Sequence, residues 1–231
     1  MKLTTIQIQD LYRFTRVHFV EYYDLQTELV DHLANDIEAI WEDNANLSFE
    51  EARGKAFKKF GVYGFSDVVT QRERAMHKRY IKYLFRELKQ WFSFPKVMTT
   101  VAMFLIFYMV FSTKFSEYFI YAFYGILALF GLYKSFVLNK KFKQKKKIAK
   151  KTWLLEDLIF KQAILFFGFF IYYTINLVNH IHAIHQTKYL VILVSGLFSI
   201  MCLLAYVSLE LLPNKAEILL KETYPEYAIS V

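Results

Sequence analysis

The chain has 231 residues, of which 55% are hydrophobic and 19% aromatic, and it carries a formal net charge of +8. This apolar content is unusual for a water-soluble domain and favours a membrane protein. The single cysteine, Cys202, excludes an intramolecular disulfide and a cysteine-based metal site. The N-terminal segment lacks the apolar core of a signal peptide, so we expect the start of the chain to stay in the cytoplasm.

The charge is distributed unevenly along the chain. Residues 1–60 hold 7 basic and 11 acidic residues, residues 61–96 hold 8 and 3, and the remainder holds 14 and 7. An acidic head is therefore followed by basic belts beside apolar segments. This pattern favours contact with an anionic membrane surface, and we expect no direct binding of nucleic acid.

Residues 1–65 are predicted to form a small cytoplasmic helical head. Apolar residues recur at three- and four-residue spacing, and no strand-like alternation is found. Asp24 is placed to cap the second helix. Ser48 and Glu51 have the spacing of a capping box at the start of the third helix, which Gly61 is expected to end in a left-handed conformation.

The stretch ELVDHLANDIE, residues 28–38, concentrates carboxylates and a histidine on one side of the second helix. Neighbours four residues apart, such as Glu28 and His32, can share a metal ion or a proton. The head has no further histidine or cysteine at ligand spacing and no HExxH motif, which favours an ordinary solvated face. We interpret this face as a surface for a basic protein partner, formed by Glu28, Asp31, His32, Asp36 and Glu38.

This stretch and the one that follows it resemble the small helical domain called HAAS, and also the prefix domain that precedes some bacterial ABC-type permeases. The resemblance covers roughly residues 5–70. It depends on ELVDHLANDIE followed by the pattern S-x-E-E-A-x-x-x-A-x-x-x-F-G, which is formed by Ser48, Glu50, Glu51, Ala52, Ala56, Phe60 and Gly61.

The resemblance implies a bacterial inner-membrane protein with a cytoplasmic helical head followed by several spans. Such proteins are often encoded near PadR-type transcriptional regulators and are associated with signalling or regulation. The chain departs from the family in the turn after Phe-Gly, where VYGFS replaces a short turn containing Asp and Pro. Four spans leave no room for a permease core, and the family supplies no catalytic residues.

Residues 66–95 predict a basic amphipathic stalk helix on the inner membrane face, with a break at Pro95. The segment 96–212 is predicted to form a bundle of four transmembrane helices. Its apolar runs are residues 97–112, 118–138, 163–178 and 189–209. Trp91 and Trp153 stand at membrane-facing ends of these runs, where indoles favour the interface.

A lysine-rich loop, residues 139–151, joins the second and third runs. Its positive charge places it in the cytoplasm, and with four spans both chain ends lie there too, including a tail at residues 213–231. We expect the loop to contact anionic headgroups of the lipid bilayer. Its membrane-surface residues are Lys140, Lys141, Lys143, Lys145, Lys146, Lys147, Lys150 and Lys151.

The outward segment NHIHAIHQ holds His180, His182 and His185, which could bind a metal ion or charge together at low pH. An interfacial turn explains the same residues. The apolar runs contain no Asp, Glu or Arg at mid-depth, which argues against ion-coupled transport. No catalytic motif is found, so we expect neither an enzyme nor a cofactor.

The sequence therefore favours a non-enzymatic adaptor or regulator of the bacterial cytoplasmic membrane. Its head would bind a cytoplasmic protein, for which the resemblance offers a PadR-type regulator, and self-association into a homo-oligomer is a second candidate. The alternative is a small transporter or a metal- or pH-sensing membrane protein that uses the histidine segment.

Overall fold

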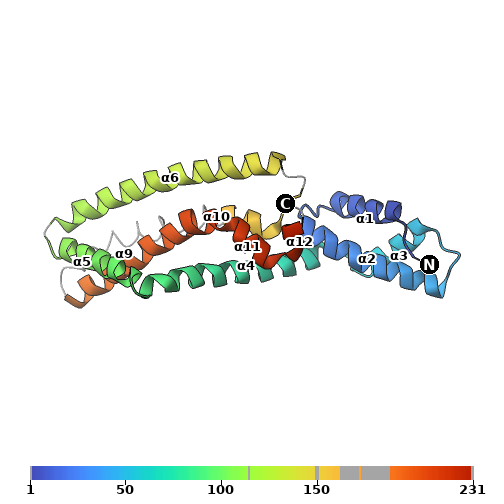
Figure 1. Cartoon of the computed structure of the whole chain (residues 1–231), viewed down its shortest axis with the longest axis horizontal. Coiled ribbons are helices and arrows are strands. Elements are labelled where there is room, and N and C mark those ends of the chain that lie inside the picture. The colour runs from blue at the N-terminus through green and yellow to red at the C-terminus, as the bar shows by residue number, and fades with distance from the viewer. Residues whose placement is uncertain (1, 114, 149–150, 162–171, 173–187, 230–231) are drawn as a thin grey trace. The chain divides into compact units, whose positions relative to one another are not determined.

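The computed structural model describes residues 2–113, 115–148, 151–161, 172 and 188–229, and every regular element among them is a helix (Figure 1). The all-α prediction is confirmed for this part of the chain. The helices divide into two compact units. Unit 1 comprises Met1–Lys78 with Ile148–Leu155, and unit 2 comprises Arg79–Lys147 with Glu156–Val231.

Unit 1 is a helical head with its own apolar core. It contains α1 (Thr5–Val17), α2 (Tyr23–Asp43), α3 (Phe49–Lys58) and the first half of α4 (Ser66–Lys89). The apolar positions that recur every three or four residues face inward, as the sequence predicts. The apolar residues of α1, α2 and α3 that are completely buried are Leu11, Leu29, Leu33, Ile37, Ala52 and Ala56.

The local signals at the helix ends are largely confirmed. Ser48 and Glu51 form the predicted capping box, and the hydroxyl of Ser48 holds the pKa of the Glu51 carboxyl below its ordinary value. Gly61 has the predicted positive φ, +80°. The prediction that Asp24 caps α2 is wrong, because α2 begins directly after Tyr22 and Asp24 lies within the first turn.

Gly64 is the more constrained of the two glycines in the turn after α3. Its φ is +54°, and a Cβ there would lie 2.9 Å from Cζ of Phe57, whose ring packs edge-on against Phe65. Gly64→Ala is therefore expected to lower the free energy of unfolding by about 1–3 kcal/mol, because strain and overpacking add. Hydrogen exchange of α3 in the full chain measures this effect.

Gly54 provides the matched control for this prediction. It lies inside α3, and a Cβ there meets nothing within 4 Å. Gly54→Ala is expected to slow exchange in α3, since alanine stabilises a helix interior by roughly 0.4–1 kcal/mol relative to glycine. Equal exchange rates in Gly64→Ala and the wild type would contradict the steric argument.

Unit 2 contains the longer apolar helices. α4 continues into a 3-10 turn, η1 (Gln90–Phe92), and α5 (Lys96–Phe111) follows Pro95 at an angle of 84° to α4 and η1. The predicted break at Pro95 is confirmed. The remaining labelled elements are α6 (Ser116–Ile148), α9 (Lys188–Tyr206), the π-helix η2 (Val207–Leu211), α10 (Leu212–Asn214), α11 (Ala216–Thr223) and α12 (Pro225–Ile229). Residues 154–161 are also helical.

Two helical stretches of the described chain are long and apolar enough to cross a membrane, Tyr118–Lys147 and Lys188–Asn214. A third is reached if the bent pair of Ser66–Phe92 and Lys96–Phe111 counts as one span. The predicted bundle of four transmembrane helices is therefore not confirmed. The third apolar run, residues 163–178, lies outside the described residues except for Tyr172.

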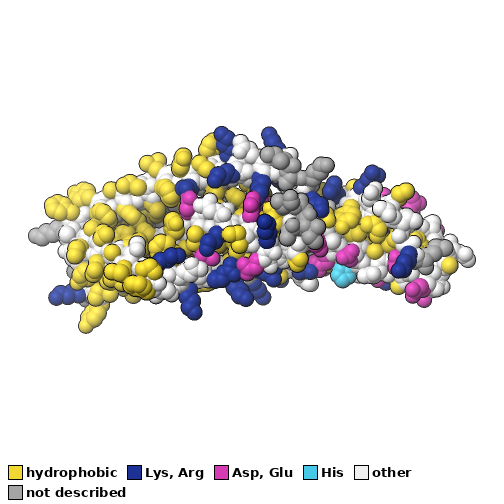
Figure 2. All heavy atoms as spheres, viewed as in Figure 1, with side chains coloured by type: hydrophobic (Ala, Val, Ile, Leu, Met, Phe, Trp, Pro, Cys, Tyr) yellow, Lys and Arg dark blue, Asp and Glu magenta, His cyan; other side chains and the backbone are white. Residues whose placement is uncertain are grey.

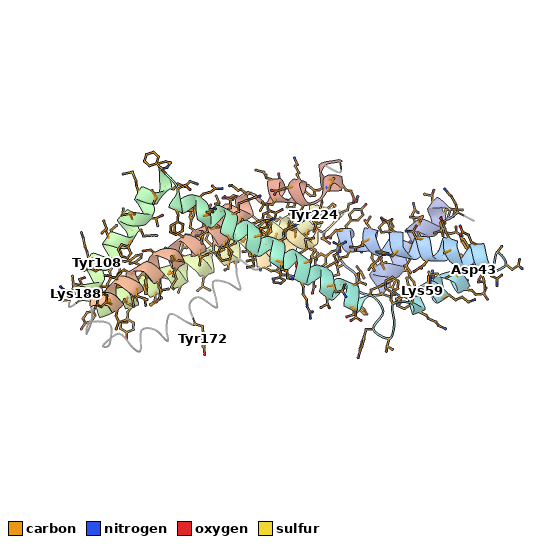
Figure 3. All side chains as sticks on the ribbon, turned by 90° about the horizontal axis from the view of Figure 1, so that it is seen from below. Asp43, Lys59, Tyr108, Tyr172, Lys188 and Tyr224 are labelled. Atoms are coloured by element: carbon orange, nitrogen blue, oxygen red, sulfur yellow. The ribbon has the colours of Figure 1, made fainter. Side chains whose placement is uncertain are left out.

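An aromatic cluster joins α5, α6 and α9. Phe198 of α9 lies 4.9 Å from Phe111 and 5.7 Å from Phe107 of α5, and 5.8 Å from Tyr124 of α6, measured between ring centroids. α5 and α9 pack directly against each other (Figure 3). Around this cluster, yellow apolar side chains cover the visible surface of the same helices (Figure 2), as expected for helices that meet lipid.

Two predicted features of the segment after residue 138 differ in the structure. The lysine-rich loop is helical as far as Ile148, because α6 continues without a break. Trp153 is 3% exposed and packs inside unit 1 against Tyr23, so its indole is not exposed as that of an interfacial anchor would be. The predicted tail, to which the sequence analysis assigned no secondary structure, contains α11, whose Leu219 and Leu220 are buried in unit 2.

Candidate functional site

The predicted acidic face of α2 is partly used by the head itself. Glu28 forms an ion pair with Arg72 of α4. The Asp36 carboxylate lies 2.6 Å from Nζ of Lys59, just after α3. Both carboxylates are half-buried, so they connect α2 to its neighbours and are not free for a partner.

Of the other three predicted residues of this face, one is bonded within the head and two are accessible to solvent. Glu38 accepts a hydrogen bond of 3.0 Å from the backbone N–H of Leu3. Asp31 and His32 are exposed, and the structure brings no metal-ligating cluster to them within the described residues. The accessible part of the predicted surface is thus reduced to these two neighbours.

Unit 1 also carries exposed apolar side chains that the sequence analysis did not single out. Phe19 is 91% exposed at a positive φ of 64°, and Val62 and Tyr63 are 98% and 76% exposed in the turn after α3. The residues that flank the two segments are in contact, because the ring centroids of His18 and Phe65 are 5.8 Å apart. We call Phe19, Val62 and Tyr63 the apolar tip.

The segment 151–155 completes the start of α2. The carbonyl of Thr152 accepts a hydrogen bond of 2.7 Å from Tyr23 N–H, and the Thr152 hydroxyl donates one of 3.0 Å to the carbonyl of Glu21. In return, Asp24 Oδ1 accepts a hydrogen bond of 3.2 Å from Leu154 N–H. The first N–H groups of a helix have no partner within the helix, and α2 has no side-chain cap. The carbonyl of Thr152 satisfies one of them, the N–H of Tyr23.

Side chains of the same segment anchor it. The Trp153 ring packs edge-on against Tyr23, with 5.4 Å between centroids, and Leu155 is fully buried. Lys151 Nζ lies 3.8 Å from the centroid of the Tyr23 ring. A hydrogen bond with Lys151 lowers the pKa of the Tyr23 hydroxyl. A piece of chain that follows the start of α2 by about 130 residues in the sequence therefore forms part of the head.

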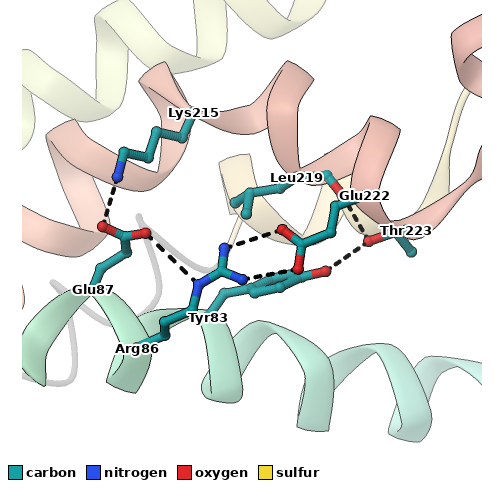
Figure 4. Close-up of polar contacts among 7 residues, drawn as sticks. All are labelled: Tyr83, Arg86, Glu87, Lys215, Leu219, Glu222 and Thr223. Carbon is teal, nitrogen blue, oxygen red and sulfur yellow. Dashed lines mark hydrogen bonds and ion pairs between the residues drawn. The ribbon is translucent and has the colours of Figure 1, made fainter.

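A polar layer in unit 2 connects α4 to the C-terminal helices (Figure 4). Arg86 donates two hydrogen bonds, of 2.8 and 3.2 Å, to the two carboxylate oxygens of Glu222. Beside this pair, the hydroxyls of Tyr83 and Thr223 are 3.0 Å apart. The two-pronged geometry orients α11 relative to α4.

Glu87 is the buried centre of this layer. Its side chain is 3% exposed, and Oε2 lies 2.7 Å from Nζ of Lys215, while Oε1 lies 3.9 Å from Arg86 Nε (Figure 4). A buried carboxylate stays charged only when a cation is close to it. Lys215 therefore serves as the main counter-charge of Glu87.

Two lysines of α6 reach further carboxylates. Lys134 forms an ion pair with Glu210 of η2. Lys145 Nζ lies 2.8 Å from Glu156, whose side chain is 8% exposed, and 3.4 Å from Glu217 of α11. The polar layer therefore joins α4, α6, the helix at residues 154–161 and the C-terminal helices of unit 2.

The Arg86–Glu222 pair predicts a pH dependence. Hydrogen bonding to Arg86 lowers the pKa of Glu222 from its ordinary value of 4.5. Because the folded pKa is below the unfolded one, the pair stabilises the fold above about pH 4.5, and this contribution is lost as the pH falls through the folded value. The difference in melting temperature between the wild type and Glu222→Gln should therefore shrink from pH 7 to pH 3.5. A constant difference would contradict this assignment.

The lysines of the predicted membrane surface lie in different environments. Lys145 is paired in the polar layer and Lys151 lies against Tyr23. Lys146 is exposed and interacts elsewhere in the molecule. Lys150 lies outside the described residues, as do the candidate metal ligands His180, His182 and His185. The remaining lysines, which are exposed, are Lys140, Lys141, Lys143 and Lys147.

Comparisons of the whole chain with known proteins leave its family open. No protein-family model matches the chain, and neither a curated protein nor a solved structure is significantly similar to it.

Proposed function

We propose that this protein is a non-enzymatic membrane adaptor or regulator whose helical head binds a cytoplasmic protein. The main support for the proposal is the structure of the head. It has its own core and capped helices, and it forms a compact unit separate from the apolar helices. A domain built in this way presents a stable surface to a partner, while the apolar helices hold it at a membrane.

The proposed location is the bacterial cytoplasmic membrane, with both chain ends in the cytoplasm. Helices long and apolar enough to span a bilayer support membrane insertion. The lysines at the end of α6 support the cytoplasmic side for that end. The resemblance to the HAAS domain supports a signalling role and offers a PadR-type regulator as the first partner to test.

The partner would meet Asp31 and His32 on α2 together with the apolar tip. Exposed apolar groups provide the hydrophobic core of an interface, and an exposed carboxylate favours a basic partner. Glu28, Asp36 and Glu38 support this surface indirectly, because their internal contacts fix α2 against α4, Lys59 and the N-terminus.

Crosslinking in living cells, followed by purification of the full chain, tests the proposal. Asp31→Lys is expected to reduce recovery of the partner at least tenfold, because it sets like charges against each other. Asp43→Lys is the matched control, since it makes the same change at another exposed position near the end of α2. Both variants must still insert into the membrane for this result to count.

Phe19→Asn tests the apolar tip separately. Asparagine adopts positive φ more readily than phenylalanine, so this change removes the exposed ring without straining the backbone. Recovery of the partner is again expected to fall at least tenfold. If recovery of the partner is undiminished in both Asp31→Lys and Phe19→Asn, the head does not bind the partner through this surface.

A further inference from the structure

The C-terminal half of α6 has two faces with different surroundings. Lys134, Leu138 and Lys145 are four and seven residues apart, which places them on one side of the helix. This side is packed. Leu138 is 5% exposed, and the two lysines reach Glu210 and Glu156 in unit 2.

The opposite side carries a separate set of polar groups. Lys143 and Lys147 are each two residues from Lys145, so they point away from the packed side. A hollow of about 310 Å³ lies along this face. We call it the lysine groove, and it is lined by Phe136, Asn139, Lys140, Lys143, Gln144 and Lys147.

The three lysines of the groove are available for a ligand. Lys140, Lys143 and Lys147 are exposed, and none forms an ion pair with a described residue. The space-filling view shows Lys and Arg side chains gathered over this part of α6 (Figure 2). Three like charges without counter-charges attract an anion.

The position of the groove limits the kind of anion. In the preceding turns of α6, the side chains of Leu129, Leu132 and Tyr133 are 64–70% exposed. Phe136, at the N-terminal end of the groove, is 70% exposed. The groove therefore begins where the apolar surface of a candidate span ends. In a membrane this is the depth of the lipid headgroups.

We propose that the lysine groove binds the headgroup of an anionic phospholipid, with a preference for a headgroup that carries two phosphates. Lys140 and Lys147 are separated by about 10 Å along the helix axis, so two phosphates can each approach a different ammonium group. Lys143 lies between them, and the amides of Asn139 and Gln144 supply further hydrogen-bond donors. Phe136 contacts the adjoining acyl chains.

This proposal rests on the membrane placement of α6 under the proposed function and not on the identity of the head's partner. Lipid binding by the purified full chain in a neutral detergent can be measured without that partner. A failure of lipid binding would therefore leave the interaction of the head untouched, and the reverse also holds.

The test titrates the full chain with phosphatidylcholine, phosphatidylglycerol, cardiolipin and inorganic phosphate, and counts bound molecules by native mass spectrometry. Cardiolipin, with two phosphates, is expected to bind most tightly, and phosphatidylcholine and free phosphate weakly. Lys140→Gln/Lys143→Gln/Lys147→Gln should weaken cardiolipin binding on the order of 100-fold, about fivefold for each lysine.

Two further variants make the result decisive. Lys2→Gln/Lys55→Gln/Lys58→Gln removes the same charge from exposed positions of the head and should leave cardiolipin binding unchanged. Replacement of the three groove lysines by arginine should retain binding and shows that the site tolerates substitution. An equal loss in both glutamine variants, or binding of free phosphate as tight as that of cardiolipin, would overturn the proposal. Displacement of cardiolipin by a soluble acidic peptide at micromolar concentration would also overturn it, in favour of a protein ligand.

Discussion

Lys215→Met is expected to lower the free energy of unfolding by about 3–5 kcal/mol, as found when one partner of a buried ion pair is removed. Glu87 is 3% exposed in its side chain, and Lys215 is the cation closest to it, at 2.7 Å. Without Lys215, the nearest cation is Arg86 at 3.9 Å, which also binds Glu222. Thermal unfolding of the full chain in detergent measures the loss.

Two companion variants distinguish the effect of leaving the Glu87 carboxylate unpaired from the effect of losing an ion pair. Glu87→Gln/Lys215→Met removes both charges and should recover most of the lost stability, because no uncompensated carboxylate remains. Glu222→Gln should cost less than about 1 kcal/mol, since that pair is exposed to solvent. If Lys215→Met and Glu222→Gln have equal effects, burial of Glu87 does not control the stability of the polar layer.

Trp153→Ala is expected to destabilise the start of α2 by about 3–5 kcal/mol, the usual effect of deleting a large buried aromatic side chain. The Trp153 ring holds the segment 151–155 against Tyr23, whose N–H donates to Thr152. Hydrogen exchange of the first turns of α2 should therefore accelerate at least 100-fold, while the distant end of α2 near Trp41 changes less.

Trp91→Ala is the control for this experiment. Trp91 lies in unit 2, where its ring contacts Tyr206 at 5.5 Å between centroids, so exchange in α2 should remain as in the wild type. A slow-exchanging α2 in Trp153→Ala would mean that the segment 151–155 contributes nothing to the head. A fragment of residues 1–78 should show the same fast exchange as Trp153→Ala, because it lacks the segment altogether.

The features that the sequence predicted well are local. The capping box of Ser48 and Glu51 involves groups three residues apart, and the break at Pro95 follows from the shape of one residue. The buried face of α2 follows from spacing along a single helix. The boundary of α6 was predicted wrongly for a related reason. Lysine has a good helix propensity, so a charged stretch can extend an apolar helix where no proline or glycine stops it.

The candidate site was only partly predictable. Charge and phasing identified the acidic face of α2, but they could not distinguish Asp31, which is exposed, from Glu28, which pairs with Arg72. The apolar tip had a weak signal in the glycines beside Val62 and Tyr63, which mark a tight turn. Phe19 had none, because its exposure results from the chain reversal between α1 and α2.

By itself, the sequence determined the helical class, the positions of most helix ends and the presence of apolar helices, because each depends on residues within a few turns of one another. Only the tertiary structure decided which charges are neutralised and which remain available. Lys215 and Glu87 are 128 residues apart, and Thr152 and Glu21 are 131 apart, and no periodicity connects such pairs. The same physical reason separates Lys145 from the lysine groove, since neighbouring lysines of one helix differ only in what the fold places opposite them.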